Sequence, residues 1–152
     1  MNAAPAFDRN GKKLSEGEVQ ISEMPRFAPG EWVRLLPHGE LINDTMMGNF
    51  VNIAKHSHWN RFVLWTKRKD IVKKFEIPAN MFIIYSNPNL NRYSDNIPEK
   101  FHGIFNVFTE EYALHNKIDI NCMQKCIECM KCYSGKSGFV INEMLKKQDD
   151  KK

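Results

Sequence analysis

Apolar runs of strand length and apolar patterns of helical spacing alternate along most of the chain. Nearly continuous apolar runs occupy residues 32–36, 61–66, 81–85 and 104–108. After the first run, Asn43 or Asp44 can cap a helix whose apolar residues recur at helical spacing, and a shorter helical pattern covers residues 68–75. Strands that are apolar throughout and separated by helices are typical of parallel strands covered on both faces. The pattern predicts an α/β fold.

The last third of the chain fits more than one pattern. Residues 109–111 are expected to open a helical turn, and residues 139–141 fit either a last strand or a closing helix that includes Met144 and Leu145. Before them, the polar residues 87–96 predict a long irregular loop. We therefore expect a partial barrel or an open, mostly parallel sheet of about four to five strands, with a C-terminal cysteine-rich loop.

Composition divides the 152 residues into one domain and two tails. Residues 1–30 combine prolines, glycines and charges with few large apolar side chains, which predicts a flexible leader. Residues 31–145 are predicted to form the α/β domain, and residues 146–152 a charged tail. A chain of this length can bury a core of its own but is short for a closed eight-stranded barrel.

Hydropathy argues against a membrane-spanning protein. No apolar run approaches the length that crosses a bilayer, and the polar start of the chain lacks the apolar segment of a signal peptide. We therefore expect a cytoplasmic protein in a reducing compartment, without membrane contact. The net charge of +4 and the isoelectric point near 8.9 permit contact with nucleic acid, but many proteins without such a partner share these values.

All four cysteines of the chain lie within residues 121–133. They are Cys122, Cys126, Cys129 and Cys132, separated by three, two and two residues. Cysteines gathered in one short loop can place their soft thiolates around one metal centre. We therefore predict that this loop binds a metal.

The spacing favours an iron–sulfur cluster over zinc. A structural zinc ion usually takes two Cys-x-x-Cys pairs from separate segments, whereas a [4Fe–4S] cluster is large enough for one run such as Cys126-x2-Cys129-x2-Cys132 to wrap around it. Cys122 would then supply the fourth ligand. Because no proline follows the last cysteine and there is no second cysteine run, zinc and free or redox-paired thiols stay open as alternatives.

The first three cysteines also have the spacing of the radical S-adenosylmethionine motif. In those enzymes the motif follows the first strand and a barrel comes after it, whereas about twenty residues follow Cys132 here, too few for a domain. Ile127 also stands where that motif usually has an aromatic residue. Position therefore argues against this special case of a cluster.

A second group of candidate residues follows the predicted strands. The group comprises His38, Gly39, Glu40, Thr66, Lys67, Ser86 and Asn87. Ligands of parallel sheets bind beyond the carboxyl ends of the strands, so these side chains are expected near one site. Glu40 can act as a base or a cation ligand, and Lys67 can hold an anion. Loop residues are commonly polar for solvation alone, which is the alternative and the more frequent case.

Basic residues gather around the second predicted helix. They are Lys67, Arg68, Lys69, Lys73 and Lys74. A solvated helix face is the ordinary meaning of such a stretch. The alternative is a weak contact with the phosphate backbone of nucleic acid, without readout of the bases.

The order of these parts resembles the phage gene product 88 domain family over residues 31–145. The shared features are an arginine, a glycine-acidic pair after the first strand, an aromatic-Thr-Lys strand end and a closing cysteine run. Carried over position by position, they correspond to Arg34, Gly39, Glu40, Thr66, Lys67 and the four cysteines. Members of the family begin with a further cysteine-bearing segment, so the chain resembles the family's C-terminal part. The resemblance implies a phage or prophage origin and a cysteine-bound metal, but supplies no reaction.

Three functions are consistent with these residues. The first is a phage-derived, metal-binding α/β protein of unknown reaction, with an iron–sulfur cluster preferred over zinc. The second is a zinc-stabilised, non-catalytic module that binds nucleic acid or protein through the basic helix. The third is a degenerate fragment without activity, because residues 1–30 contain no cysteine. Whether the protein is an enzyme is left open by the sequence.

Overall fold

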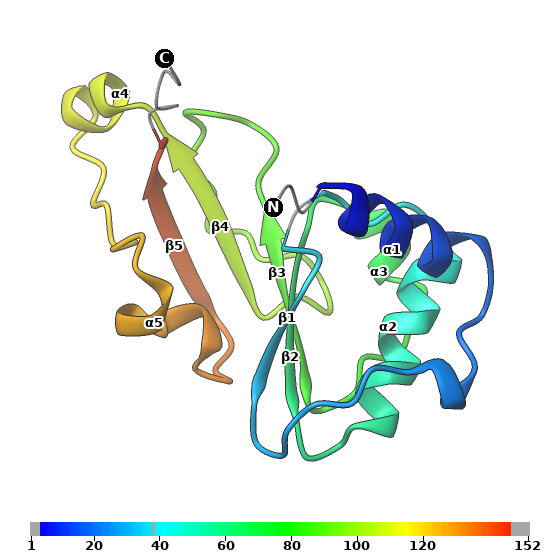
Figure 1. Ribbon diagram of the computed structural model, residues 1–152. Coiled ribbons are helices and arrows are strands. Elements are labelled where there is room, and N and C mark those ends of the chain that lie inside the picture. Colours follow the sequence, from blue (N-terminus) through cyan, green and yellow to red (C-terminus); the bar gives the residue numbers. More distant parts are fainter. Residues whose placement is uncertain (1–3, 38, 147–152) are drawn as a thin grey trace.

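The computed structural model describes residues 4–37 and 39–146. Its single sheet has five strands, all parallel, in the order β1-β2-β3-β4-β5. The strands are β1 (Trp32–Leu35), β2 (Arg61–Thr66), β3 (Met81–Ser86), β4 (Gly103–Phe108) and β5 (Phe139–Met144). The helices are α1 (Ala4–Glu16), α2 (Asp44–His56), α3 (Lys69–Val72), α4 (Glu110–His115) and α5 (Cys126–Cys129), with short 3-10 helices η1 (Ile21–Glu23) and η2 (Lys131–Tyr133). The sheet is open, with β1 and β5 at its edges, so the predicted α/β class is confirmed (Figure 1).

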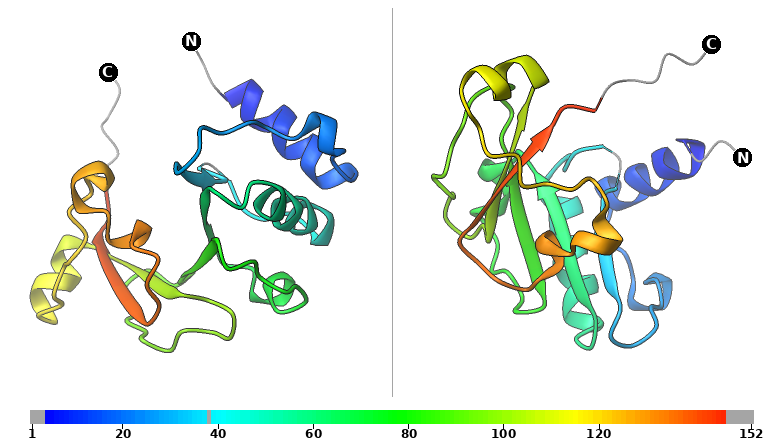
Figure 2. Two further views of the ribbon diagram at one scale, coloured as in Figure 1. Left: turned by 90° about the horizontal axis from the view of Figure 1, so that it is seen from below. Right: turned by 90° about the vertical axis from the view of Figure 1, so that its left-hand side faces the viewer.

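The two faces of the sheet have different coverings. Side chains alternate between the faces along each strand, and partners in the parallel register share a face. The helix face packs against α2 and α3 and carries Leu35, Phe62, Leu64, Met81 and Ile83. The opposite face, here called the cysteine face, carries Trp32, Arg34, Val63, Trp65 and Phe82. In the right-hand view of Figure 2, the loop with α5 lies in front of the sheet and α2 lies behind it.

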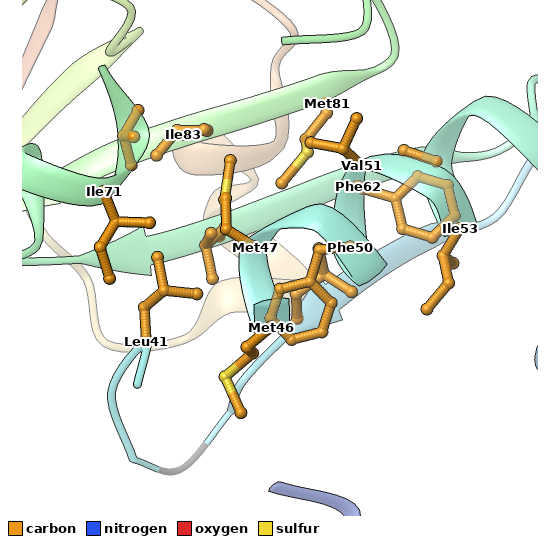
Figure 3. Close-up of a cluster of buried hydrophobic side chains, with 14 of the residues drawn as sticks. Leu41, Met46, Met47, Phe50, Val51, Ile53, Phe62, Ile71, Met81 and Ile83 are labelled. Carbon is orange, nitrogen blue, oxygen red and sulfur yellow. The ribbon is translucent and has the colours of Figure 1, made fainter. Parts of the chain in front are cut away.

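The hydrophobic core lies between the helix face and α2. Met46 and Met47 of α2 are fully buried, as is Phe62 of β2 (Figure 3). The helix begins as predicted, because the Asn43 side-chain oxygen accepts a hydrogen bond from the Met46 N–H at 3.0 Å. The methionine pair therefore fills the core, as flexible apolar side chains often do.

Helix α3 is shorter than the predicted segment of residues 68–75. After Val72 the chain continues in tight turns, in which the N–H of Lys74 bonds to the Ile71 carbonyl oxygen and the N–H of Phe75 bonds to that of Val72. Phe75 still packs against the core. The apolar spacing predicted the inward side chains correctly but not the extent of the helix.

The described part of the chain before β1 packs against α2, through contacts that the composition of residues 1–30 did not indicate. Asn49 of α2 is 1% exposed and accepts a hydrogen bond from the Val19 N–H at 2.9 Å. Its amide nitrogen donates to the carbonyl oxygens of Leu14 and Gly17, both at 2.8 Å. One buried amide thus satisfies three backbone groups of the leader and orders it.

Beside β4 and β5, the irregular loop after β3 takes the place of a covering helix. Asn106 of β4 is fully buried and donates hydrogen bonds to Asn142 of β5 at 3.1 Å and to the Ser94 carbonyl oxygen at 2.9 Å. Its own oxygen accepts from the Asn87 amide at 2.9 Å. This asparagine network connects the predicted loop to two strands and makes a polar core there.

The end of the domain is a strand. Residues 139–144 pair with β4 along their whole length, so the alternative of a closing helix was wrong. The predicted helical turn after β4 is confirmed as α4, whose N-cap Thr109 accepts a hydrogen bond from the Tyr112 N–H at 3.3 Å. Of the charged tail predicted for residues 146–152, residues 147–152 lie outside the described part. Within the described ranges, no helix is long and apolar enough to cross a membrane.

Candidate metal centre

The cysteine loop begins along the free edge of β5. The main-chain N–H groups of Asn121 and Cys122 both donate to the carbonyl oxygen of Asn142, at 3.2 and 3.1 Å. The Asn121 side-chain oxygen accepts from the Asn142 N–H at 2.9 Å, and the Gln124 amide donates to the Met144 carbonyl oxygen at 2.7 Å. These bonds fix Cys122 beside β5 and cover part of an edge that would otherwise expose unpaired backbone groups.

The other three cysteines lie in two consecutive tight turns. Cys126 and Cys129 are the first and last residues of α5 and are three positions apart, so they lie on one side of the helix. Met130 follows with a positive φ of 50°, a left-handed conformation that is uncommon outside glycine. It ends α5 and begins η2, which brings Cys132 to the same pocket as the other thiols.

Tyr133 attaches the far end of the loop to the cysteine face. Its ring centroid lies 5.8 Å from that of Trp32 on β1 and 5.7 Å from that of Trp65 on β2. Aromatic pairs at this separation add to the stability that burial of their surface supplies. Because Tyr133 directly follows Cys132, this contact holds the last cysteine close to the sheet.

The four cysteines line one pocket of about 20 Å³, together with Tyr133 and Ile141 of β5. All four are free thiols, of which Cys126 is exposed and the others are partly buried. Among residues 4–37 and 39–146, no three Cys, His, Asp or Glu side chains are placed so that they could hold one metal ion. The loop therefore gathers its thiols around a common space without the convergence that a single ion requires.

Burial affects the pKa of two of these thiols. Burial raises the pKa of Cys132 to about 12, the neighbouring cysteines add to the rise, and the positive charge of Arg34 opposes it. Burial also raises the pKa of Cys122. Because a metal binds the thiolate, coordination at these positions has to release protons.

Arg34, a candidate ligand-binding residue that the family resemblance names together with Glu40 and the cysteines, lies near Cys132 and not near Glu40. Its guanidinium lies 4.5 Å from the centre of the Trp65 ring, a cation–π contact on the cysteine face. The same charge lowers the pKa of Tyr133 and of Glu143, although burial is the larger effect and raises both. Arg34 therefore supplies positive charge near Cys132 and Tyr133.

Comparison with protein-family models shows which family the chain belongs to. The model of the Gene product 88 family matches residues 15–152. The chain belongs to the Gene product 88 family. The match extends beyond the expected range of residues 31–145 at both ends. At the start it includes residues 15–30, the second half of the segment predicted as a leader. Searches of the curated proteins and of the solved structures find no match.

In this Gene product 88 domain, the predicted strand-end residues mainly form hydrogen bonds that join the domain's own loops. The Glu40 carboxylate accepts hydrogen bonds from the Thr66 hydroxyl, from the Lys67 N–H at 2.9 Å and from the Leu41 N–H at 2.7 Å. Glu40, Thr66 and Lys67 thus meet, as expected from parallel strand ends, and their contacts join the loop after β1 to the end of β2. His38 lies outside the described residues.

Arg34 is separate from this group because of strand alternation. In register it pairs with Val63, so it shares a face with Val63 and Trp65, whereas the buried Thr66 lies on the other face. Glu40 and Arg34 therefore belong to different sites. The remaining strand-end residue with a described role, Asn87, belongs to the asparagine network.

The basic stretch of this family member is partly neutralised within the fold. Arg68 forms a two-pronged pair with Asp70, at 2.9 and 2.8 Å, and the pair lowers the pKa of Asp70 to about 2. Lys74 pairs with Asp44 at 2.8 Å, and Lys69 lies over the Tyr85 ring at 5.1 Å. Fewer positive charges are therefore free for phosphate than the sequence predicted.

Sequence reasoning missed the aromatic side chains that hold the cysteine loop. Trp32, Trp65 and Tyr133 were not among the candidates, although Tyr133 is the residue next to Cys132. The alternation of side chains along the first strand could have shown that Trp32 and Arg34 lie on the same face, opposite to Leu35. The partner on β2 could not be identified from sequence, since it depends on the register between strands.

Proposed function

We propose that this phage protein is an iron–sulfur protein in which Cys122, Cys126, Cys129 and Cys132 hold one [4Fe–4S] cluster on the cysteine face. The single observation that carries the proposal is that all four thiols line one pocket. Four cysteine thiolates are the ordinary ligand set of such clusters. The cytoplasm of a phage's host is a reducing compartment, which would keep these thiols available.

The spacing of the cysteines favours a cluster over a single zinc ion, because Cys126-x2-Cys129-x2-Cys132 is one run within one loop. Zinc draws its sulfur ligands to about 2.3 Å from one point and usually takes them from two separate segments. A cluster spreads its ligands over a larger body. The present pocket has a volume of about 20 Å³, and Cys126 at this pocket is exposed.

Both ends of the loop are attached to the sheet, whereas its middle is not packed against a core. Cys122 is bonded to β5, and Tyr133 packs on two tryptophans. Ile127 in the middle of α5 is 93% exposed, and the residues of this helix have no core to hold them. Metal binding would therefore supply the ordering that packing does not.

The surrounding side chains suit a negatively charged cluster. When bound, a cluster of this type accepts and donates single electrons. Tyr133 and Ile141 close the inner side of the pocket with apolar surface and so limit the access of water. Arg34 offsets negative charge on the thiolates, in particular that on Cys132.

Serine variants of the cysteines test the proposal. Replacing Cys129 or Cys132 with serine removes a soft ligand and is expected to lower the iron content of protein purified without oxygen, and its thermal stability with it. Ser134→Ala, in the same loop but outside the ligand set, serves as the matched control and should leave iron content unchanged. Equal iron content in all these proteins would contradict the proposal, and one zinc per chain lost with the cysteines would point to the zinc-stabilised alternative.

A further inference from the structure

A second, larger pocket lies on the cysteine face at the amino-terminal ends of β2 and β3. It has a volume of about 470 Å³, within the range of about 300–1,000 Å³ that is typical of small-molecule sites. Its walls include Trp59, Asn60, Arg61, Asn80, Phe82 and Ser134. No acidic residue of the described chain lines it.

Arg61 gives this pocket an available positive charge. Its side chain is exposed, and the guanidinium lies 5.3 Å from the centre of the Trp32 ring. The contact holds the planar group without using its hydrogen-bond donors, and Arg61 forms no ion pair with any residue in the described ranges. A guanidinium held in this way is suited to a phosphate group.

Trp59 gives the pocket an exposed aromatic surface that is held in place. It is 49% exposed, its ring lies 4.5 Å from that of His58, and its carbonyl oxygen accepts a hydrogen bond from the Gly30 N–H at 3.1 Å. A large exposed indole beside a pocket leaves apolar surface in water until a ligand covers it. Flat aromatic rings are the ligands that such a surface stacks with best.

Asn60 gives an independent indication of a polar ligand. It is fully buried, and its amide nitrogen donates to the Ala28 carbonyl oxygen at 2.6 Å. Its side-chain oxygen has no hydrogen-bond partner within the described residues. Buried acceptors are rarely left unsatisfied, and Asn60 is one of the residues that line the pocket.

We propose that this pocket binds a nucleotide unit, an aromatic base that carries a phosphate. The base would stack on Trp59, and Arg61 would hold the phosphate. The unit can come from a free nucleotide or from single-stranded nucleic acid, which share this chemistry. The proposal does not depend on the cysteines, so it can fail or succeed independently of the cluster.

Calorimetric titration of the full chain tests the proposal, with adenosine monophosphate, adenosine and a single-stranded deoxyadenosine decamer as probes. Adenosine monophosphate is expected to bind more tightly than adenosine, because adenosine lacks the phosphate that Arg61 would hold. A decamer that binds much more tightly than the mononucleotide, with a steep loss at high salt, would identify nucleic acid as the source. Similar affinities would identify the free nucleotide. No binding of any probe would overturn the proposal.

Matched variants locate the binding. Trp59→Ala and Arg61→Gln should each weaken binding by about tenfold or more. Tyr93→Ala and Arg92→Gln are the controls, because Tyr93 is also 49% exposed and Arg92 is exposed beside it. Arg61 is a surface residue, so its variant will fold even if the tryptophan variant does not. Unchanged binding by folded Arg61→Gln would contradict the site.

A double variant separates this pocket from the basic stretch. Lys67 and Lys73 are exposed and lie in the region of α3. Replacing both with glutamine should leave binding in the pocket unchanged. A loss of decamer binding in the double variant, with none in Arg61→Gln, would place the nucleic-acid contact at α3 and overturn the assignment to the pocket.

Discussion

The helix face of the sheet is closed by side chains that have no access to water, whereas the cysteine face is covered by a loop whose residues stay partly exposed. Met46, Met47 and Phe62 are all 0% exposed on the first face. On the second, Ile127 is 93% exposed and Cys126 is exposed beside it. Burial stabilises the strands on both faces, since Val63 and Ile84 of the cysteine face are also 0% exposed. The loop over that face, in contrast, is held by a few bonds to β5 and by Tyr133. The difference indicates that the helix face forms the main hydrophobic core, whereas the loop over the cysteine face is held by few contacts.

The largest effect is expected from a cavity in the core of the helix face. Phe62→Ala removes a fully buried ring that also packs against Phe27, with centroids 5.5 Å apart. We expect a loss of about 3–5 kcal/mol in the free energy of unfolding, measured by urea denaturation. Phe105→Ala on the partly buried cysteine face is the matched control. An equal loss in both variants would contradict the difference between the faces.

The next largest effect is expected in the asparagine network. Asn106→Ala leaves Asn87 and Asn142 without one hydrogen-bond partner each in a buried setting. We expect a loss of about 2–3 kcal/mol on unfolding in urea, because buried polar groups without partners are costly. Asn96→Ala on the exposed part of the same loop should change stability little. A neutral effect of Asn106→Ala would show that the network does not support this part of the sheet.

Loss of the aromatic attachment is expected to affect metal content more than stability. Tyr133→Ala removes the contacts with Trp32 and Trp65 but no buried core side chain. Iron content of protein purified without oxygen should fall, while the urea midpoint should shift less than in Phe62→Ala. Tyr93→Ala, an exposed tyrosine elsewhere, is the control. Full iron content in Tyr133→Ala would mean that the loop positions its cysteines without this residue.

The smallest effect is expected from the protonation of His102, which directly precedes β4. His102 Nδ1 accepts a hydrogen bond from the Ile83 N–H at 3.0 Å, and burial lowers the pKa of His102 below its ordinary value of 6.5. The unfolded chain therefore binds the proton more readily, so this stabilisation is complete above about pH 6.5 and is lost as the pH falls through the lower folded-state pKa. His102→Asn keeps an acceptor oxygen but cannot titrate in this range. The fall in stability between about pH 7.5 and 5.5 should be smaller in the variant, and equal pH dependence would contradict the assignment.

Much of the helix face could be predicted from the sequence because local signals specify it. Buried strands show as apolar runs, and Asn43 marks the start of α2. The leader could not be predicted in this way. Its order depends on Asn49, whose bonds reach residues thirty or more positions earlier, namely Leu14, Gly17 and Val19. Polar side chains that satisfy distant backbone groups leave no periodic pattern.

The clustering of the cysteines was visible in the sequence, but the side chains that surround them were not. Clustered cysteines are visible in any sequence, so the candidate thiols could be named at once. Arg34 and Trp65 meet only because β1 and β2 pair in one particular register, and Glu40 is separated from Arg34 by strand alternation. Register depends on packing of the whole sheet, which one sequence does not reveal.

An iron–sulfur cluster on the cysteine face is tested first by the iron, acid-labile sulfide and zinc content of the unmodified chain, purified without oxygen and examined by visible absorption. We expect about four irons and four sulfides per chain, with a brown colour. One zinc without sulfide, or no metal at all, would show that the four cysteines do not hold such a cluster.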